Sequence, residues 1–261
     1  MTIIASVKVR DGLILGTDSM TQISAQTEDG PQLLKSYSNA RKLFQIRDAP
    51  VGVMTYGLGN IGNRSIEGLV LDFNRTAAAT MPAVVDLAQS LYDFVREQYD
   101  ALYALVEPAQ KPALGFYVAG YSADAPFPEE LEFLLPRDDA PLVAREPEQF
   151  GASWRGIDIA FTRIYKGLDP RIIPWLQEKG LTDADVDELF SQLEIGVLYD
   201  GMPVQDAINF ATYILETTIG WTEFQIGAPS CGRPLQVATV LFDEGFHWVA
   251  KPELRIQTPL S

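Results

Sequence analysis

The sequence predicts an α+β protein in which two antiparallel sheets lie between outer helices, giving α/β/β/α layers. The prediction rests on the order of the elements: strands, two helices, further strands, several helices and a final pair of strands. Blocks of strands separated by blocks of helices favour antiparallel sheets, because a parallel sheet needs strands and helices that alternate one by one. The 261 residues contain no repeat, linker or break in composition, so we expect a single domain over residues 1–261.

Short β-branched and aliphatic runs predict the strands. Predicted strands span residues 2–9, 13–18, 42–57 (a hairpin with its turn at 48–50), 114–122, 130–136, 234–242 and 246–254. Asp11-Gly12, between the first two runs, is typical of a type I′ hairpin turn. The polar segment 22–38 is predicted to be a loop.

Apolar residues at helical spacing predict the helices, which span residues 59–74, 82–106, 152–166, 181–193 and 202–221. The clearest is 82–106, where Pro82 stands at the start and residues such as Leu87 and Leu91 recur on one face. The helix over 181–193 has Thr182 as its N-cap and Asp185 three positions later, which is close to a capping box.

The composition excludes several classes of function. A net charge of −15 opposes binding to phosphates, so we expect no nucleic-acid partner. A single cysteine, Cys231, excludes an intrachain disulfide and favours a reducing compartment. With only His247 beside it, a Cys/His zinc site is excluded, and we expect no metal and no cofactor. The sequence shows no signal peptide and no apolar run of ~20 residues, which indicates a cytoplasmic protein with no membrane partner.

The candidate chemistry lies at Thr2. Common nucleotide-binding, serine-hydrolase and zinc-protease motifs are absent, and His247, in a predicted strand between aromatic residues, is expected to be structural. Methionine before threonine is usually removed in cells, so Thr2 would carry both a hydroxyl group and a free α-amine. An α-amine has a pKa of about 7.7–8.0 and is able to take the hydroxyl proton as a general base.

Such a nucleophile needs a nearby cation that lowers the pKa of the amine and stabilises developing negative charge. Lys42 and Asp18 stand at strand boundaries, where hairpins bring side chains together. An ideal two-residue turn at Asp11-Gly12 would pair Ala5 with Asp18. Asp18 would then lie about three residues from Thr2 along the ladder, or ~10 Å, and a bulge would be needed to bring them together.

The beginning of the chain resembles a mature proteasome β-subunit and its simpler bacterial relatives, which are N-terminal nucleophile (Ntn) hydrolases. Thr2, the stretch "LILGTDS" with Asp18 and Ser19, and "RKLFQI" with Lys42 match that family in type and order. "MTYGLGN" matches the strand-to-helix turn that holds the family's oxyanion-hole glycine, here Gly57. The resemblance is specific over roughly the first 60 residues and implies the four-layer Ntn sandwich.

The resemblance implies a threonine peptidase without a cofactor. Thr2 would be the nucleophile, with Asp18, Lys42 and Gly57 as the other catalytic residues and Ser19, Ser153 and Ser230 as supporting ones. The family's earlier serine falls at Ala152 or Ser153, and the aspartate expected three residues before Ser230 is Gly227. Residues 168–199 are expected to be a helical insertion.

Three readings of the function follow from the resemblance. The first is a peptidase that cleaves peptides or unfolded proteins as a homo-oligomeric ring or stacked assembly, with an unfoldase as a possible partner. The second is a non-catalytic assembly subunit, favoured by Gly227. The third is a small-molecule amidase of the Ntn superfamily, although the Asp18 and Lys42 pair favours the proteasome branch.

Overall fold

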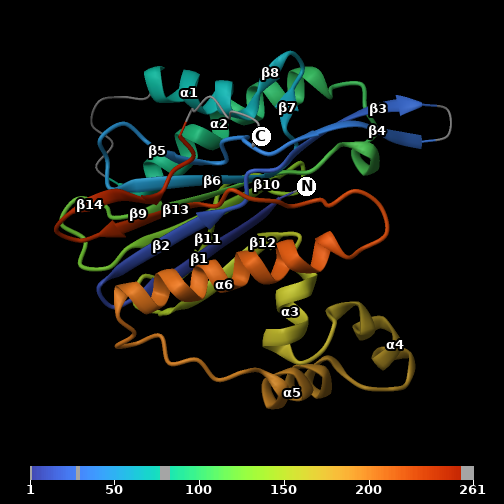
Figure 1. Cartoon of the computed structure of the whole chain (residues 1–261), viewed down its shortest axis with the longest axis vertical. Coiled ribbons are helices and arrows are strands. Elements are labelled where there is room, and N and C mark those ends of the chain that lie inside the picture. The colour runs from blue at the N-terminus through green and yellow to red at the C-terminus, as the bar shows by residue number, and fades with distance from the viewer. Residues whose placement is uncertain (1, 28–29, 77–82, 254–261) are drawn as a thin grey trace, which may run out of the picture.

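Two five-stranded antiparallel sheets form the centre of the computed structural model, which describes residues 2–27, 30–76 and 83–253 (Figure 1). The first sheet has the order β12 (Gly151–Gly156), β1 (Ile3–Val9), β2 (Gly12–Thr17), β13 (Gln236–Leu241) and β14 (Gly245–Ala250). The second sheet has the order β11 (Leu142–Arg145), β10 (Glu129–Leu135), β9 (Leu114–Gly120), β6 (Val51–Gly57) and β5 (Leu43–Gln45). Two smaller hairpins are β3 (Thr21–Thr27) with β4 (Gly30–Tyr37), and β7 (Asn60–Ile61) with β8 (Arg64–Ser65).

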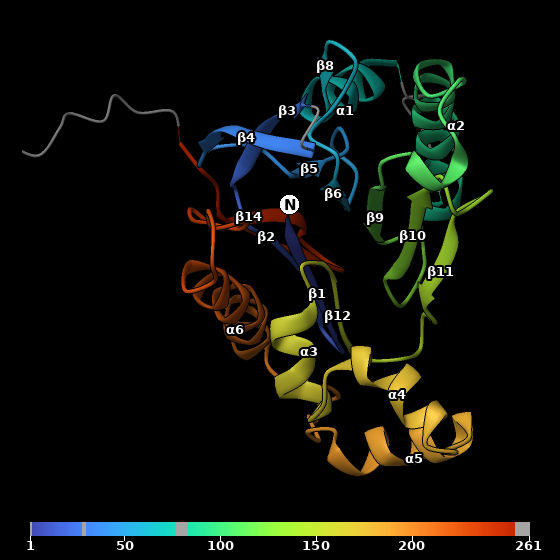
Figure 2. The same cartoon turned by 90° about the vertical axis from the view of Figure 1, so that its right-hand side faces the viewer.

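Helices cover the outer face of each sheet, as Figure 2 shows. They are α1 (Ile66–Thr76), α2 (Val84–Leu102), α3 (Ile159–Lys166), α4 (Ile173–Glu178), α5 (Asp183–Leu193) and α6 (Val204–Glu223), with short 3₁₀ turns η1 (Pro108–Gln110) and η2 (Pro170–Ile172). The helices α1 and α2 pack on the second sheet, and α3 and α6 pack on the first. The four-layer α/β/β/α prediction is therefore confirmed. Among the described residues, no helix has the length and apolarity that crossing a membrane requires.

Three apolar layers hold the four layers of secondary structure together. One lies between α1, α2 and the second sheet, one between the first sheet and α3, α6, and one between the two sheets. In β1, Ile3 and Ala5 face the helices whereas Ile4 faces the other sheet, because side chains alternate along a strand. Burial on both faces explains why β1 reads as a nearly continuous apolar run.

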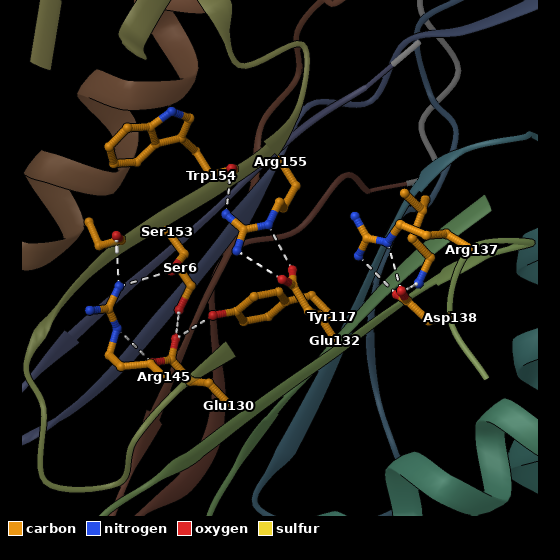
Figure 3. Close-up of polar contacts among 12 residues, drawn as sticks. Ser6, Tyr117, Glu130, Glu132, Arg137, Asp138, Arg145, Ser153, Trp154 and Arg155 are labelled. Atoms are coloured by element: carbon orange, nitrogen blue, oxygen red, sulfur yellow. Dashed lines mark hydrogen bonds and ion pairs between the residues drawn. The ribbon is translucent and has the colours of Figure 1, made fainter. Parts of the chain in front are cut away.

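Polar residues also lie in the layer between the sheets, and Figure 3 shows one cluster of them. Glu130 of β10 accepts hydrogen bonds from Ser6 and, at 2.8 Å, from the hydroxyl group of Tyr117. Its second oxygen lies 3.2 Å from Nε of Arg145, and Arg145 also donates to the hydroxyl group of Ser153 at 2.9 Å. Burial raises the pKa of Tyr117 well above its usual value, so this phenol stays protonated and donates a hydrogen bond to the carboxylate. The cluster ties β1 and β12 to the second sheet.

Several predicted elements are confirmed. The helix predicted over 82–106 is α2, although Pro82 lies outside the described residues. Thr182 and Asp185 form a complete capping box at the start of α5. Pro203 stands just before α6, and the two closing strands are β13 and β14.

Other predictions were wrong, and in each case the pairing of strands explains the difference. The predicted loop over 22–38 is largely the β3–β4 hairpin. The helix predicted over 152–166 begins only at Ile159, because residues 151–156 form β12 on the edge of β1. The helix predicted over 59–74 begins at Ile66, after the β7–β8 hairpin. The partner of β12 is distant in sequence and leaves no local signature, whereas β3–β4 and β7–β8 are local hairpins, the first polar and the second only two residues in each strand.

We expect the free energy of unfolding to fall most when a large apolar side chain is removed from the layer between the sheets. Leu15 of β2 is fully buried there, so Leu15→Ala should lower the free energy of unfolding by about 2–5 kcal/mol. Leu105 is fully exposed, and Leu105→Ala should change it by less than about 0.5 kcal/mol. Urea denaturation measures both values, and equal effects would contradict this account of the core.

Candidate active site

The register of the first hairpin brings Asp18 next to Thr2. Ile4 pairs with Thr17 and Val9 with Gly12, so the turn lies at residues 10 and 11, and Asp18 stands opposite Ile3. The backbone N–H of Ile3 donates to Oδ1 of Asp18 at 3.2 Å, and the N–H of Asp18 donates to the carbonyl oxygen of Ile3 at 3.2 Å. The predicted Asp11-Gly12 turn, which would pair Asp18 with Ala5, was wrong by two residues in register. No bulge is needed to bring Asp18 next to Thr2.

Asp18 is fully buried and is held by several donors. Lys42 donates from Nζ to Oδ1 of Asp18 at 2.8 Å, forming an ion pair in which the lysine side chain is only 8% exposed. The other carboxylate oxygen, Oδ2, accepts from the backbone N–H groups of Met20 at 3.0 Å and Gly232 at 3.1 Å. A buried carboxylate with this many donors has a fixed orientation, and it fixes the lysine in turn.

Gln236 of β13 positions the segment that carries Lys42. Its Oε1 accepts from the backbone N–H groups of Lys42 at 3.1 Å and Leu43 at 3.2 Å. Its Nε2 donates to the hydroxyl group of Ser19 at 2.8 Å and to the carbonyl oxygen of Ala40 at 2.8 Å. Gln236 therefore links Ser19 to the segment that carries Lys42. Gln236 was not predicted from the sequence, because its only sign there is a polar residue in a largely apolar strand.

Thr2, Lys42 and Gly57 line one cavity of about 510 Å³. Thr2 lies on the face of β1 that packs against the second sheet, because it is two residues from Ile4. Gly57 ends β6 with a φ of +93°, and an added Cβ would lie 2.3 Å from the carbonyl oxygen of Ala113. Only glycine fits this position, so the backbone takes a conformation that other residues avoid. The cavity thus brings together three of the four residues predicted to be catalytic, and Asp18 holds one of them.

The predicted supporting serines do not all lie at the cavity. Ser153 pairs with Ser6 in the ladder, four residues from Thr2, which is about 13 Å at the rise of a strand. It belongs to the Glu130 and Arg145 cluster (Figure 3), and its expected place beside Thr2 is corrected. At Thr2 itself, the carbonyl oxygen accepts from the N–H of Ile157 at 2.8 Å.

Ser230 is buried in the loop between α6 and β13, two residues before Gly232. Gly232 accepts a hydrogen bond from the N–H of Ser19 at 3.0 Å, in addition to donating to Asp18. The loop with Ser230 is therefore attached to the site by its backbone.

Two other ionisable groups at the site are neutral. Burial, and then the nearby Glu132, raises the pKa of Tyr56 in the cavity wall to about 12. Burial, followed by the Asp18 carboxylate, raises the pKa of Cys231 to about 12. A thiol with this pKa is a poor nucleophile near neutral pH, so Cys231 is not a candidate for that role.

The two helix-covered antiparallel sheets, with Thr2 at the first strand and the Asp18–Lys42 pair beside it, define the chain as having the proteasome-like Ntn-hydrolase fold. No protein-family model matches the sequence, and no curated protein sequence matches it significantly. The fold is therefore recognised by comparison with solved structures.

Those structures include Anbu, an ancestral β-subunit. Anbu from Yersinia bercovieri is 15% identical with a TM-score of 0.57, and the match covers 95% of this chain and 87% of Anbu. The helical assembly of the Anbu complex from Pseudomonas aeruginosa is 17% identical with a TM-score of 0.56, covering 96% and 88%. A Gly-1 mutant of Anbu from Hyphomicrobium sp. strain MC1 is 14% identical with a TM-score of 0.55, covering 96% and 86%.

The buried ion pair predicts a double-mutant cycle. Asp18→Asn should lower the free energy of unfolding by about 3–5 kcal/mol, because it leaves the Lys42 charge buried without its counter-charge. Adding Lys42→Met should restore part of that loss, and urea denaturation of the two single variants and the double variant measures the coupling. The partly exposed Lys166–Glu194 pair is the control, where Glu194→Gln should change stability by about 0–1 kcal/mol. Additive losses at Asp18 and Lys42 would contradict a direct interaction.

Proposed function

We propose that this chain is a proteasome-like threonine peptidase that hydrolyses peptide bonds through an acyl-enzyme on Thr2. The observation that carries the proposal is the shared cavity of Thr2, Lys42 and Gly57, with Lys42 held by a fully buried Asp18. A buried ion pair contributes little to stability compared with apolar residues of the same size. Its presence beside a hydroxyl nucleophile is therefore better explained by chemistry than by folding.

In the proposed mechanism, removal of Met1 frees the α-amine of Thr2. The amine takes the proton of the Thr2 hydroxyl group as the oxygen attacks the carbonyl carbon of the substrate. The Lys42 ammonium, oriented by Asp18, stabilises the negative charge that develops on the attacking oxygen. The N–H of Gly57 donates to the carbonyl oxygen under attack. The amine then gives the proton to the leaving amine, and water hydrolyses the acyl-enzyme by the same path in reverse order.

The walls of the cavity support an extended peptide as substrate. Residues at the base of β3, such as Gln22, form one wall, and Gly57 and Leu58 at the end of β6 form another. Backbone groups at strand ends pair readily with an extended peptide. From Val51 to Asn63 the sequence has no charge, so this wall does not repel a peptide of either sign.

A homo-oligomeric assembly belongs to the same proposal. The Anbu complex of Pseudomonas aeruginosa is described as a helical assembly, and this chain matches it over 96% of its length. The rival reading is a non-catalytic assembly subunit on the same fold. Two observations favour it: Gly227 stands where an aspartate was expected, and Ser153 lies apart from Thr2. The measurements below separate the two.

Replacing the nucleophile should abolish hydrolysis. Thr2→Ala should lower the turnover of a panel of fluorogenic peptides by on the order of 10³-fold or more, because it removes the group that forms the acyl-enzyme. Thr2→Ser keeps a hydroxyl group and is the matched control, which should retain measurable activity. Peptide turnover that survives Thr2→Ala would exclude this mechanism, and turnover of only small amides would favour the amidase reading.

The mature chain should begin with Thr2. Mass spectrometry of the N-terminal peptide of the purified protein measures this, because the α-amine acts as the general base only when nothing precedes Thr2. A mature protein that begins with Met1 would favour the non-catalytic assembly subunit.

A further inference from the structure

The cavity beside Thr2 contains a second cation in addition to Lys42. Of the described residues that line it, only Arg41, Lys42 and Glu67 carry a charge. Lys42 already has Asp18 as its counter-charge, at 2.8 Å. Arg41 and Glu67 are therefore the charged residues of the cavity that the proposed mechanism does not use.

The guanidinium group of Arg41 lies against aromatic rings and keeps N–H groups without a partner. Its carbon Cζ is 5.0 Å from the centre of the Phe44 ring and 5.8 Å from that of Trp248. Its Nε donates to the carbonyl oxygen of Leu43 at 3.2 Å. Among the residues that the structure describes, Nη1 and Nη2 have no hydrogen-bond or ion-pair partner. The planar fork that these two nitrogens form matches the two oxygens of a carboxylate.

Arg41 has lost part of its hydration, and no protein carboxylate in the described part of the chain replaces it. Burial lowers the pKa of Arg41, and the opposing effect of the Glu67 charge is smaller. Glu67 acts only from a distance, because the described residues include no ion pair between the two side chains. Glu67 also stands in the first turn of α1, where the helix N-terminus stabilises its carboxylate. A partly buried cation in this position is stabilised by an anion that enters its pocket.

A buried hydroxyl group in the wall of the same cavity also lacks a partner. Thr55 of β6 is only 4% exposed, and its Oγ1 has no hydrogen-bond partner within the described part of the chain. The backbone N–H of Thr55 donates to the carbonyl oxygen of Lys42 at 3.1 Å, so Thr55 lies next to the segment that carries Arg41. Buried polar groups of folded proteins are nearly always paired, so this hydroxyl group indicates a polar ligand.

The net charge of the chain does not exclude an acidic ligand here. The charge of −15 is spread over the whole molecule, and salt at physiological ionic strength screens exposed charges over about 8 Å. Contacts inside the cavity depend on its own lining, to which Asn60, Asn63 and Ser65 contribute amide and hydroxyl groups. This lining suits a hydrophilic, negatively charged side chain better than an apolar one.

We propose that Arg41 determines specificity by binding the carboxylate of an aspartate or glutamate side chain in a peptide that occupies the cavity beside Thr2. Nη1 and Nη2 of Arg41 donate to the two carboxylate oxygens, and Thr55 supplies a hydroxyl group in the same wall. Arg41 does not touch the reacting atoms, so it sets which peptide binds and not how fast the bond is cleaved. The effect on cleavage rests on the proposed function, whereas the binding itself does not.

Peptide binding tests the proposal without any assay of hydrolysis. In the Thr2→Ala protein, fluorescent peptides with one glutamate, moved along an otherwise uncharged sequence, are compared with the same peptides carrying glutamine. Fluorescence anisotropy should show at least one glutamate peptide binding on the order of 10-fold more tightly than its glutamine counterpart. Adding Arg41→Gln should reduce this ratio to about one. Arg41→Lys keeps the charge but not the planar fork, and it should retain only part of the preference.

A reversal of charge guards against a variant that merely misfolds. With Arg41→Glu, a lysine peptide should bind more tightly than the glutamate peptide. Arg163→Gln removes an exposed arginine from α3, outside the cavity, and should keep the original ratio. The proposal would be overturned by an equal affinity for glutamate and glutamine at every position, or by a glutamate preference that survives both Arg41→Gln and Arg41→Glu.

Cleavage of the same peptides by the protein with Thr2 intact separates this proposal from the proposed function. The preferred glutamate peptide should have a lower KM than its glutamine counterpart and a similar kcat, and Arg41→Gln should remove the difference in KM. If no peptide is cleaved while the binding ratio persists, the peptidase is overturned and the acidic-peptide site stands. If peptides are cleaved without any preference for glutamate, the acidic-peptide site is overturned and the peptidase stands.

Discussion

The buried ion pair between Asp18 and Lys42 is the interaction on which the arrangement of the site depends. It joins the end of β2, in the first sheet, to the start of β5, at the edge of the second. The same carboxylate accepts from Ile3, which follows Thr2, and from Gly232 in the loop after α6. Four segments far apart in the sequence therefore meet at one carboxylate. A buried carboxylate is stable only when all of its donors are in place, so the site and the packing of the two sheets depend on each other.

A second buried carboxylate, Glu130, joins the two sheets away from Thr2. It lies in the largely apolar layer between the sheets, where it contacts Ser6, Tyr117 and Arg145. A polar cluster inside an apolar layer fixes how two sheets face each other, because each hydrogen bond is directional whereas apolar contacts are not. Ser6 is on the strand that begins next to Thr2. The position of Thr2 is thereby set by contacts at the start and in the middle of β1.

Much of the fold was predictable because its signals are local. The helices α2, α5 and α6 have apolar periodicity or a capping box within their own residues, and the β1–β2 hairpin has a short turn between aliphatic runs. Two of the features that were missed depend on distant partners. The strand β12 exists because it pairs with β1, and Gln236 matters because it reaches Lys42 and Ser19 across the sheet. The polar segment that became β3 and β4 has no apolar alternation, so a loop was the natural prediction from its composition.

The sequence by itself determined which residue types were available for chemistry. It supplied a threonine at the second position, an aspartate and a lysine at strand boundaries, and a glycine at the end of a strand. Only the tertiary structure decided which of them meet. Alternation along a strand gives the face of a side chain but not the register of the ladder, and a shift of two residues keeps every face while moving Asp18 from opposite Ala5 to opposite Ile3. For the same reason Ser153, on a suitable strand, lies about four residues too far along the ladder to support Thr2.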